Sequence, residues 1–188
     1  MNSGTSRRVL TIVVAIISLF GLAVSLKAVE KTGSVEGLVI KIDRTAKTVV
    51  VKASDGTEYT MHLAERTVVY GKNETYKGAV EAERSLQEGS KVVVHYTKQG
   101  TDNTAEEIDR IGTDGLKMSE GTITKFDRDA RTMTIKIANG TEEIYQLTEH
   151  AIDDAGIETE NAATTSAHAI VYYSEEAGHK VAHYFKTT

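Results

Sequence analysis

The chain contains no cysteine, no proline and no tryptophan, and only 6% of its residues are aromatic. The absence of cysteine excludes disulfide bonds, thiolate metal sites, cysteine nucleophiles and the lipid-bearing cysteine of a bacterial lipoprotein. The absence of proline excludes polyproline recognition segments, and the absence of tryptophan removes the best aromatic stacking platform. The fold must therefore rest on apolar packing alone, for which a hydrophobic fraction of 40% is ordinary.

The N-terminal residues have the pattern of an export segment. Two arginines precede an uncharged run of about 18 residues at 9–26, which is near the lower limit for spanning a bilayer. Ala23 and Ser25 are small residues at the two positions that a signal peptidase reads. The sequence predicts a signal peptide over residues 1–25, with an uncleaved membrane anchor as the alternative. The protein is therefore expected to be periplasmic or extracellular, and to contact the membrane only through this segment if it is retained.

The exported part of the chain is acidic. Of the 22 basic residues, two lie in the export segment, so cleavage would leave 20 basic against 27 acidic residues. An acidic chain lacks the phosphate-neutralising surface that supplies most nucleic-acid affinity. We therefore expect no nucleic-acid partner.

One stretch of the chain recurs 84 positions later. The two segments are EGLVIKIDRTAKTVVVKASDGTEYTMHL, which begins at Glu36, and EGTITKFDRDARTMTIKIANGTEEIYQL, which begins at Glu120. From Gly37 onward, eleven of 27 positions are identical without a gap. A period this long indicates two duplicated domains rather than a solenoid of short units. In the first copy the identical positions are Gly37, Lys41, Asp43, Arg44, Ala46, Thr48, Lys52, Gly56, Thr57, Glu58 and Leu63.

Each copy contains a predicted hairpin. Residues 132–137 alternate polar and apolar side chains, and residues 48–53 follow nearly the same pattern, which is typical of half-buried strands. Asp55-Gly56 and Asn139-Gly140 come next, and such dipeptides supply the positive φ angles of tight turns. A third strand therefore turns back in each copy. Its expected inward residues are Met61 and Leu63 in the first copy, and Tyr145 and Leu147 in the second.

A further strand precedes each hairpin, at 37–42 and 121–126. Val39 and Ile42 have opposite parity in the first of these strands, yet both are apolar. A β-bulge or a coiled strand would reconcile them. The strand is joined to the next by a turn that begins with Asp43-Arg44 or Asp127-Arg128. In these turns we expect aspartate to accept backbone amide hydrogen bonds while arginine stays solvated.

The second half of each copy contains a connection and another hairpin. Residues 79–86 predict a short helix, whereas Ala151–Ser166 is rich in threonine, asparagine and aspartate and predicts mostly loop. The closing strands are expected at 91–96, 105–111, 168–173 and 180–185. Three strands, a connection and a hairpin is the order of an OB-like barrel. The predicted fold class is mostly β, with two tandem OB-like five-stranded small barrels at residues 31–112 and 117–188.

A resemblance supports this architecture. The pattern G-x-V-x-x-I-D-x-x-x-x-T-V-x-V-K-x-x-D-G runs from Gly37 to Gly56, and LQEGSKV at 86–92 and AEEI at 105–108 follow it. The first copy thereby resembles the uncharacterised OB-like repeats of secreted bacterial proteins. The second copy lacks the L-x-x-G-x-x-V segment. The resemblance implies an exported small-barrel module and brings no established chemistry with it.

Three histidines of the second copy are candidate metal ligands: His168, His179 and His183. The last two have the spacing of a helical metal pair, but residues four apart on a strand are about 13 Å apart and cannot share one ion. The sequence therefore predicts surface histidines on a β face and no tight zinc or copper site built on them. The remaining histidines are expected to lie elsewhere, without a convergent ligand set: His62, His95 and His150.

The outer face of strands two and three is the usual ligand-binding face of an OB-like barrel. By parity, the outward residues on this face are Lys52, Thr60, His62, Lys136, Ile144 and Gln146. No nucleophile, base and orienting group occur together, and there is no phosphate-binding loop, so the sequence predicts neither an enzyme nor a cofactor.

Two functions follow. The leading hypothesis is an exported, non-catalytic binding or scaffold protein of the bacterial cell envelope, with an envelope protein or a surface polymer as its partner. The alternative is a periplasmic metal-handling protein that uses the histidines of the second copy.

Overall fold

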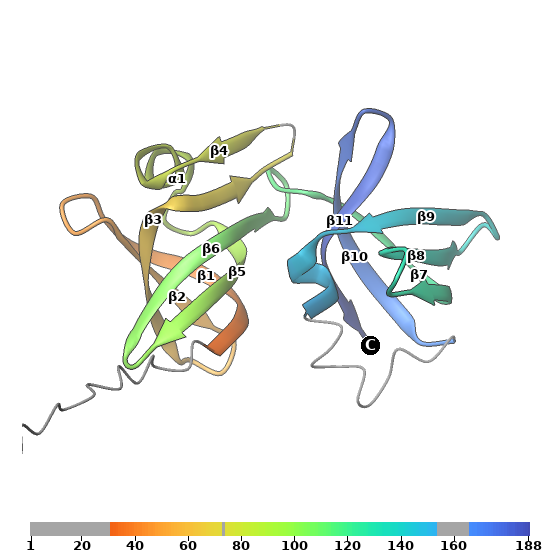
Figure 1. Cartoon of the computed structure of the whole chain (residues 1–188), viewed down its shortest axis with the longest axis horizontal. Helices are drawn as coiled ribbons and strands as arrows, with labels where there is room; N and C mark the ends of the chain where they lie inside the picture. Colours follow the sequence, from red (N-terminus) through yellow and green to blue (C-terminus); the bar gives the residue numbers. More distant parts are fainter. Residues whose placement is uncertain (1–30, 73, 154–165) are drawn as a thin grey trace, which may run out of the picture.

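The computed structural model describes residues 31–72, 74–153 and 166–188. The chain is mostly β and forms two closed five-stranded barrels that lie side by side (Figure 1). The export segment predicted for residues 1–25 lies outside the described residues. Within the described part, no helix is both long enough and apolar enough to cross a membrane.

The first barrel closes in the order β1, β2, β3, β6, β5. The β3–β6 pair is parallel and the other neighbouring pairs are antiparallel, which is the connectivity expected of an OB-like barrel. A short additional strand, β4, pairs with the second half of β3. The elements are β1 (Lys31–Asp43), β2 (Thr48–Ala53), β3 (Glu58–Tyr70), β4 (Thr75–Lys77), α1 (Ala79–Ser85), β5 (Lys91–Gln99) and β6 (Asp102–Ile111).

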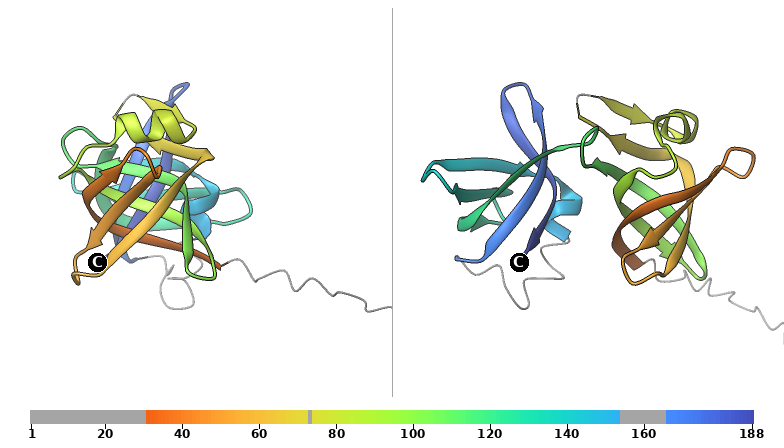
Figure 2. Two further views of the ribbon diagram at one scale, coloured as in Figure 1. Left: turned by 90° about the vertical axis from the view of Figure 1, so that its left-hand side faces the viewer. Right: turned by 180° about the vertical axis from the view of Figure 1, so that it is seen from behind.

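The second barrel repeats this connectivity in the order β7, β8, β9, β11, β10, with β9 and β11 parallel. Its strands are β7 (Lys117–Asp127), β8 (Thr132–Ile137), β9 (Glu142–Leu147), β10 (His168–Glu176) and β11 (His179–Thr187). The connection from β6 to β7 passes from one barrel to the other (Figure 2). No described strand of one barrel pairs with a strand of the other.

The connection after the third strand is helical in both barrels. The helix predicted at 79–86 is confirmed as α1. In the second barrel residues 149–153 are helical, so the loop predicted from Ala151 onward is wrong for its first three residues. Residues 154–165 of that predicted loop lie outside the described part of the chain.

The predicted turns and bulges are confirmed. Gly56 and Gly140 both have a φ of 87°, which is the left-handed conformation that the hairpin turns require. The β1–β2 register shifts between Val39 and Lys41, and the β7–β8 register shifts at the matching place in the second barrel. Each shift inserts one extra residue and allows apolar side chains of both parities to face the core.

The recurring Asp-Arg turns have the structural role expected of their aspartates. Asp43 accepts hydrogen bonds from two downstream backbone amides, and Asp127 accepts one. The arginines do more than expected, because each contacts the segment that connects strands three and four of its own barrel. Arg44 forms an ion pair with Glu83 of α1, and Arg128 donates to the carbonyl oxygen of Ile152.

Each barrel has its own apolar core. Met61, Leu63, Tyr145 and Leu147 all point inward as predicted, with exposed fractions of 5% or less. A third buried cluster lies outside both cores and joins the barrels. It consists of Val93, Ile111, Leu116 and Tyr172, with Tyr70, Ile170 and Tyr184 partly buried against it.

Because each barrel closes its own strands around its own core, we expect residues 31–112 and 117–188 to fold as separate fragments. Each fragment should be soluble and rich in β structure by circular dichroism. A spectrum dominated by helix, or by disorder in both fragments, would contradict the assignment of two domains.

Gly37 and Gly121 occupy equivalent positions in the first strands, where another strand approaches closely. A Cβ atom would lie 2.4 Å from the carbonyl oxygen of Lys52 at the first position and 2.5 Å from that of Lys136 at the second. We therefore expect Gly37→Ala and Gly121→Ala each to lower the free energy of unfolding by about 1–3 kcal/mol. At Gly56 an added Cβ atom would have no neighbour within 4 Å. Any loss of stability in Gly56→Ala would therefore come from its positive φ rather than from overpacking. Unchanged denaturation midpoints in both strand variants would contradict the close approach.

Candidate metal centre between the barrels

The six residues predicted for the ligand-binding face all point outward and are exposed. Three belong to the first barrel and three to the second, so they do not form one surface. Ile144 is the most exposed large hydrophobic side chain among them, at 66%. Lys136 lines a cavity of about 480 Å³ together with His168. The six residues are Lys52, Thr60, His62, Lys136, Ile144 and Gln146.

The three histidines proposed as metal ligands from the sequence do not converge. His168 lies at one end of the β10–β11 hairpin and contacts Glu120, with 2.8 Å between His168 Nε2 and Glu120 Oε1. His179 is exposed at the other end, opposite Glu176. His183 is fully buried, so the prediction that it is a surface histidine is wrong.

A different set of side chains gathers on the outer face of β5 and β6. Val94 and Ile108 of these strands point into the first core, and residues of the opposite parity point outward. The outward side chains are nevertheless buried, because the β10–β11 hairpin of the second barrel packs against them. His95, Glu107 and Asp109 have exposed fractions of 2%, 7% and 0%.

A β-bulge brings His183 into the same place. In the β10–β11 ladder Tyr172 is opposite Tyr184 and Tyr173 is opposite Ala182, which leaves His183 as the extra residue. A bulge interrupts the alternation of side chains and changes the direction in which one of them points. His183 thereby reaches the first barrel, whereas Ala182 packs in the core of the second.

The four side chains form a compact buried cluster, which we call the inter-barrel cluster: His95, Glu107, Asp109 and His183. His95 Nε2 lies 3.3 Å from Asp109 Oδ2. His183 Nδ1 lies 3.4 Å from Glu107 Oε1 and 3.7 Å from Asp109 Oδ1. Ligand atoms of His95, Glu107 and Asp109 all lie within 4.8 Å of one another.

Asp109 has an incompletely satisfied carboxylate. Its Oδ2 atom contacts His95, but its Oδ1 atom is buried and has no hydrogen-bond partner among the described residues. Buried polar atoms are normally hydrogen-bonded, and those that are not require an explanation. The unpaired oxygen lies toward His183 at 3.7 Å, which is too long for a hydrogen bond but suitable for two ligands of one ion.

The pKa values of Asp109 and His183 in the inter-barrel cluster are shifted by burial and by neighbouring charged groups. Burial raises the pKa of Asp109, and the charge of Glu107 raises it further. Burial alone would lower the pKa of His183, but the hydrogen bond with Glu107 and the charges of Asp109 and Glu107 raise it overall. Tyr70, whose ring centroid lies 4.1 Å from that of His183, has its pKa raised to about 12 by burial and by the same carboxylates. The cluster therefore attracts positive charge.

Hydrogen bonds fix the orientation of the His183 ring. Ser174 Oγ donates to Glu176 Oε1 at 3.0 Å and lies 2.9 Å from His183 Nε2. Because the hydroxyl proton is directed to Glu176, the serine oxygen accepts from Nε2–H. The Nδ1 atom of His183 is therefore the nitrogen that faces Glu107 and Asp109.

His150 of the second barrel extends the cluster toward the surface. Its ring stacks on that of His95, with 5.0 Å between the centroids and an interplanar angle of 24°. A cavity of about 20 Å³, roughly the space of one water molecule, lies beside them and is also lined by Glu106 and Asp153.

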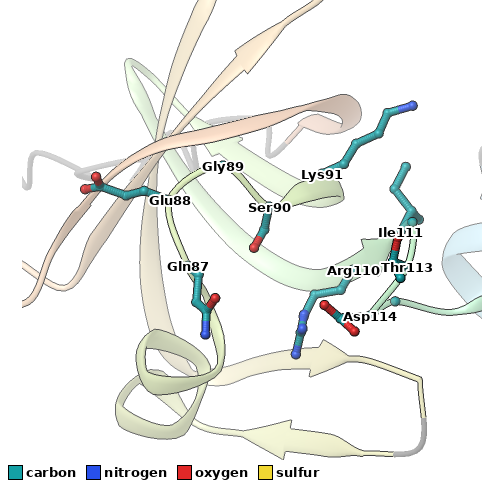
Figure 3. A pocket seen from close by; sticks show the side chains of 11 residues that line it. Gln87, Glu88, Gly89, Ser90, Lys91, Arg110, Ile111, Thr113 and Asp114 are labelled. Carbon is teal, nitrogen blue, oxygen red and sulfur yellow. The ribbon is translucent and has the colours of Figure 1, made fainter.

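A larger cavity of about 480 Å³ lies beside the connection between the barrels (Figure 3). Arg110 and Asp114 lie close together at one side of it, while the Lys91 side chain points away from them (Figure 3). The cavity is lined by no histidine and by neither buried carboxylate of the inter-barrel cluster, so it is a separate feature. Its lining residues are Gln87, Glu88, Gly89, Ser90, Lys91, Arg110, Ile111, Gly112, Thr113, Asp114 and Gly115.

The donor set of the inter-barrel cluster suits a divalent transition-metal ion. Zinc bound at about 2.0–2.1 Å in a tetrahedron places neighbouring ligand atoms about 3.3–3.4 Å apart. The His95–Asp109 and His183–Glu107 contacts are long hydrogen bonds without a metal ion, and their separations of 3.3 and 3.4 Å also fit this spacing. Two imidazoles and two carboxylates, with no thiolate, favour borderline divalent ions over soft monovalent ones.

Sequence reasoning missed this arrangement. The expectation that His95 joins no ligand set is contradicted by its grouping with Glu107 and Asp109. Acidic residues at alternate positions of a strand ordinarily indicate a solvated face, and here the second barrel covers that face. The signal that could have found the set is the pair of acids flanking the core residue Ile108, opposite a histidine on the neighbouring strand.

No protein-family model matches the chain, and no curated protein sequence matches it. Comparison with solved structures finds a chain titled "Crystal structure of Ag(I)CusF", which is 15% identical. The match covers 43% of this chain and 99% of CusF, with a TM-score of 0.33. With so low a TM-score, the similarity carries no inference about the inter-barrel cluster.

Ser174, His183 and Glu107 also have the contacts of a serine nucleophile, a histidine base and an orienting carboxylate. The positions of the protons do not favour catalysis. The hydroxyl proton of Ser174 is directed to Glu176, and the raised pKa of His183 favours an imidazolium, which cannot accept the serine proton. We therefore expect Ser174→Ala to leave the rate of 4-nitrophenyl acetate hydrolysis unchanged. A burst of nitrophenol that this substitution abolishes would contradict the expectation.

Proposed function

We propose that the protein is an exported, non-catalytic metal-handling module that binds one divalent transition-metal ion between its two barrels. The ligands are the four side chains of the inter-barrel cluster. The observation that carries the proposal is the buried Asp109 Oδ1 atom, which has no hydrogen-bond partner among the described residues; Asp109 also belongs with His95 and Glu107 to a set of donors within 4.8 Å of one another, and His183 contacts two of these three. Export is supported by the sequence alone, through the uncharged run at 9–26.

Each ligand has a role that follows from its neighbours. His183 offers Nδ1, because its Nε2–H is held by Ser174, and a partner of this kind fixes the tautomer of a metal-bound histidine. His95 offers Nε2 toward the same centre. The two carboxylates supply the negative charge that balances the ion. In the metal-free protein, the raised pKa of His183 favours its protonated form, which supplies part of that positive charge.

The leading sequence hypothesis, an envelope scaffold, has less geometric support. Its six residues are exposed as expected, but they are divided between two barrels and no described cavity collects them. The metal-handling alternative retains His183 and exchanges its other two histidines for His95, Glu107 and Asp109. We therefore rank metal binding first.

The test is a calorimetric titration of the metal-free protein with Zn²⁺, and a titration with Co²⁺ followed by visible absorption. We expect one ion per chain with micromolar or tighter affinity, and Co²⁺ bands typical of low coordination number. His183→Gln should weaken binding by more than the roughly 10–100-fold cost of losing a second-shell partner. Asp109→Asn, which preserves the shape of the side chain, should have a similar effect.

His179→Ala provides the matched control, because His179 lies on the same strand four residues away and is exposed. It should bind metal as the unaltered protein does. Circular dichroism of each variant separates the loss of a ligand from the loss of the fold. Absence of binding, or binding lost in His179→Ala but retained in His183→Gln, would overturn the proposal.

A further inference from the structure

We infer that the ion enters and leaves only when the two barrels part, and that a bound ion holds them together. This inference rests on the proposed function, since it concerns the regulation of the same site. Three ligands belong to β5 and β6 of the first barrel, and the fourth belongs to β11 of the second. An ion coordinated by all four would therefore cross-link two separately closed barrels.

Burial of the ligands requires an opening motion. The exposed fractions of His95, Glu107, Asp109 and His183 are all 7% or less. Four larger cavities are lined by none of these residues, and a cavity of about 20 Å³ leads to His95. A hydrated divalent ion is larger than the single water that such a cavity holds. Separation of the two hairpin faces exposes all four ligands at once.

The remaining contacts between the barrels are few enough to allow this motion. No described strand pairing crosses from one barrel to the other. Besides the contacts among the four ligands, the barrels meet through the small apolar cluster around Val93 and Tyr172 and through an ion pair between Lys186 and Glu36. Two ring contacts also join them, between His95 and His150 and between Tyr70 and His183. The connection includes Gly112, whose φ of 96° is unusual for other residue types.

Charge determines the direction of the coupling. Without a metal ion, closure buries two neighbouring carboxyl groups of β6 that only the imidazoles of His95 and His183 compensate, and Asp109 Oδ1 has no hydrogen-bond partner among the described residues. A divalent ion removes both penalties, and it does so only in the closed arrangement. A ligand that binds one of two states better shifts the population toward that state.

Glu36 can report whether the two barrels are in contact, because its carboxylate contacts one lysine in each barrel. Its Oε1 atom lies 2.6 Å from Lys91 Nζ of the same barrel, and its Oε2 atom lies 2.9 Å from Lys186 Nζ of the other barrel. A carbodiimide joins such pairs by an amide bond. Because both amides form from one activated carboxylate, the ratio of the 36–186 to the 36–91 product reports barrel closure independently of the rate of activation.

The experiment measures this ratio by mass spectrometry in the metal-free protein and in the protein saturated with Zn²⁺. We expect zinc to raise the ratio about fivefold or more, which is the lower end of ordinary coupling between sites. In Asp109→Asn the ratio should not respond to zinc. The radius of gyration from small-angle scattering should fall on zinc binding in the unaltered chain only.

The outcomes separate the two proposals. If calorimetry shows zinc binding that depends on His183 and the ratio stays constant, the proposed metal site is supported, but the inference that the ion holds the barrels together is wrong. If no zinc binds, both are wrong. If the ratio in Asp109→Asn responds to zinc as in the unaltered chain, zinc acts at another site, and the inference that an ion in the inter-barrel cluster holds the barrels together is wrong.

Discussion

The arrangement of the two barrels depends on how two buried carboxyl groups are compensated. Glu107 and Asp109 lie on an outer strand face that would be solvated in an isolated barrel, and packing of the second barrel removes that water. A buried carboxylate without a partner is costly, and removal of one member of a buried pair typically costs about 3–5 kcal/mol. His95 and His183 supply the compensation, one from each barrel. The same four side chains therefore set both the relative position of the barrels and the chemistry of the site.

The two barrels share their backbone features, whereas the side chains of the proposed site differ between the two copies. Both barrels carry the same bulge in their closing hairpin, where the extra residue is Glu106 in the first and His183 in the second, 77 positions later. The bulge directs Glu106 to Arg66 within the first barrel, whereas the matching bulge directs His183 to Glu107 and Asp109 across the boundary between the barrels. The asymmetry matters because two identical acidic faces would repel each other, whereas an acidic face and a histidine attract.

A closed site built from two bodies combines tight coordination with slow exchange. Structural zinc sites are closed by four protein ligands, whereas catalytic sites keep one position open for water or substrate. With His183 added to the three converging residues, the proposed site has four protein donors and a serine that orients one of them, which corresponds to the closed type. This composition is consistent with a role in holding an ion rather than in reacting at it.

The sequence by itself determined the repeat, the strands, the turn glycines and the inward face of each barrel, because these depend on local alternation and on backbone conformations that few residues adopt. It also indicated the bulge in the first strand of each copy, from apolar residues of both parities. It could not indicate β4 or that His183 is buried, because the first depends on where β3 continues and the second on a bulge deep in a ladder. Only the tertiary structure decided the site, since His95, Glu107 and Asp109 lie on the outside of one barrel and become a buried set when another barrel covers them.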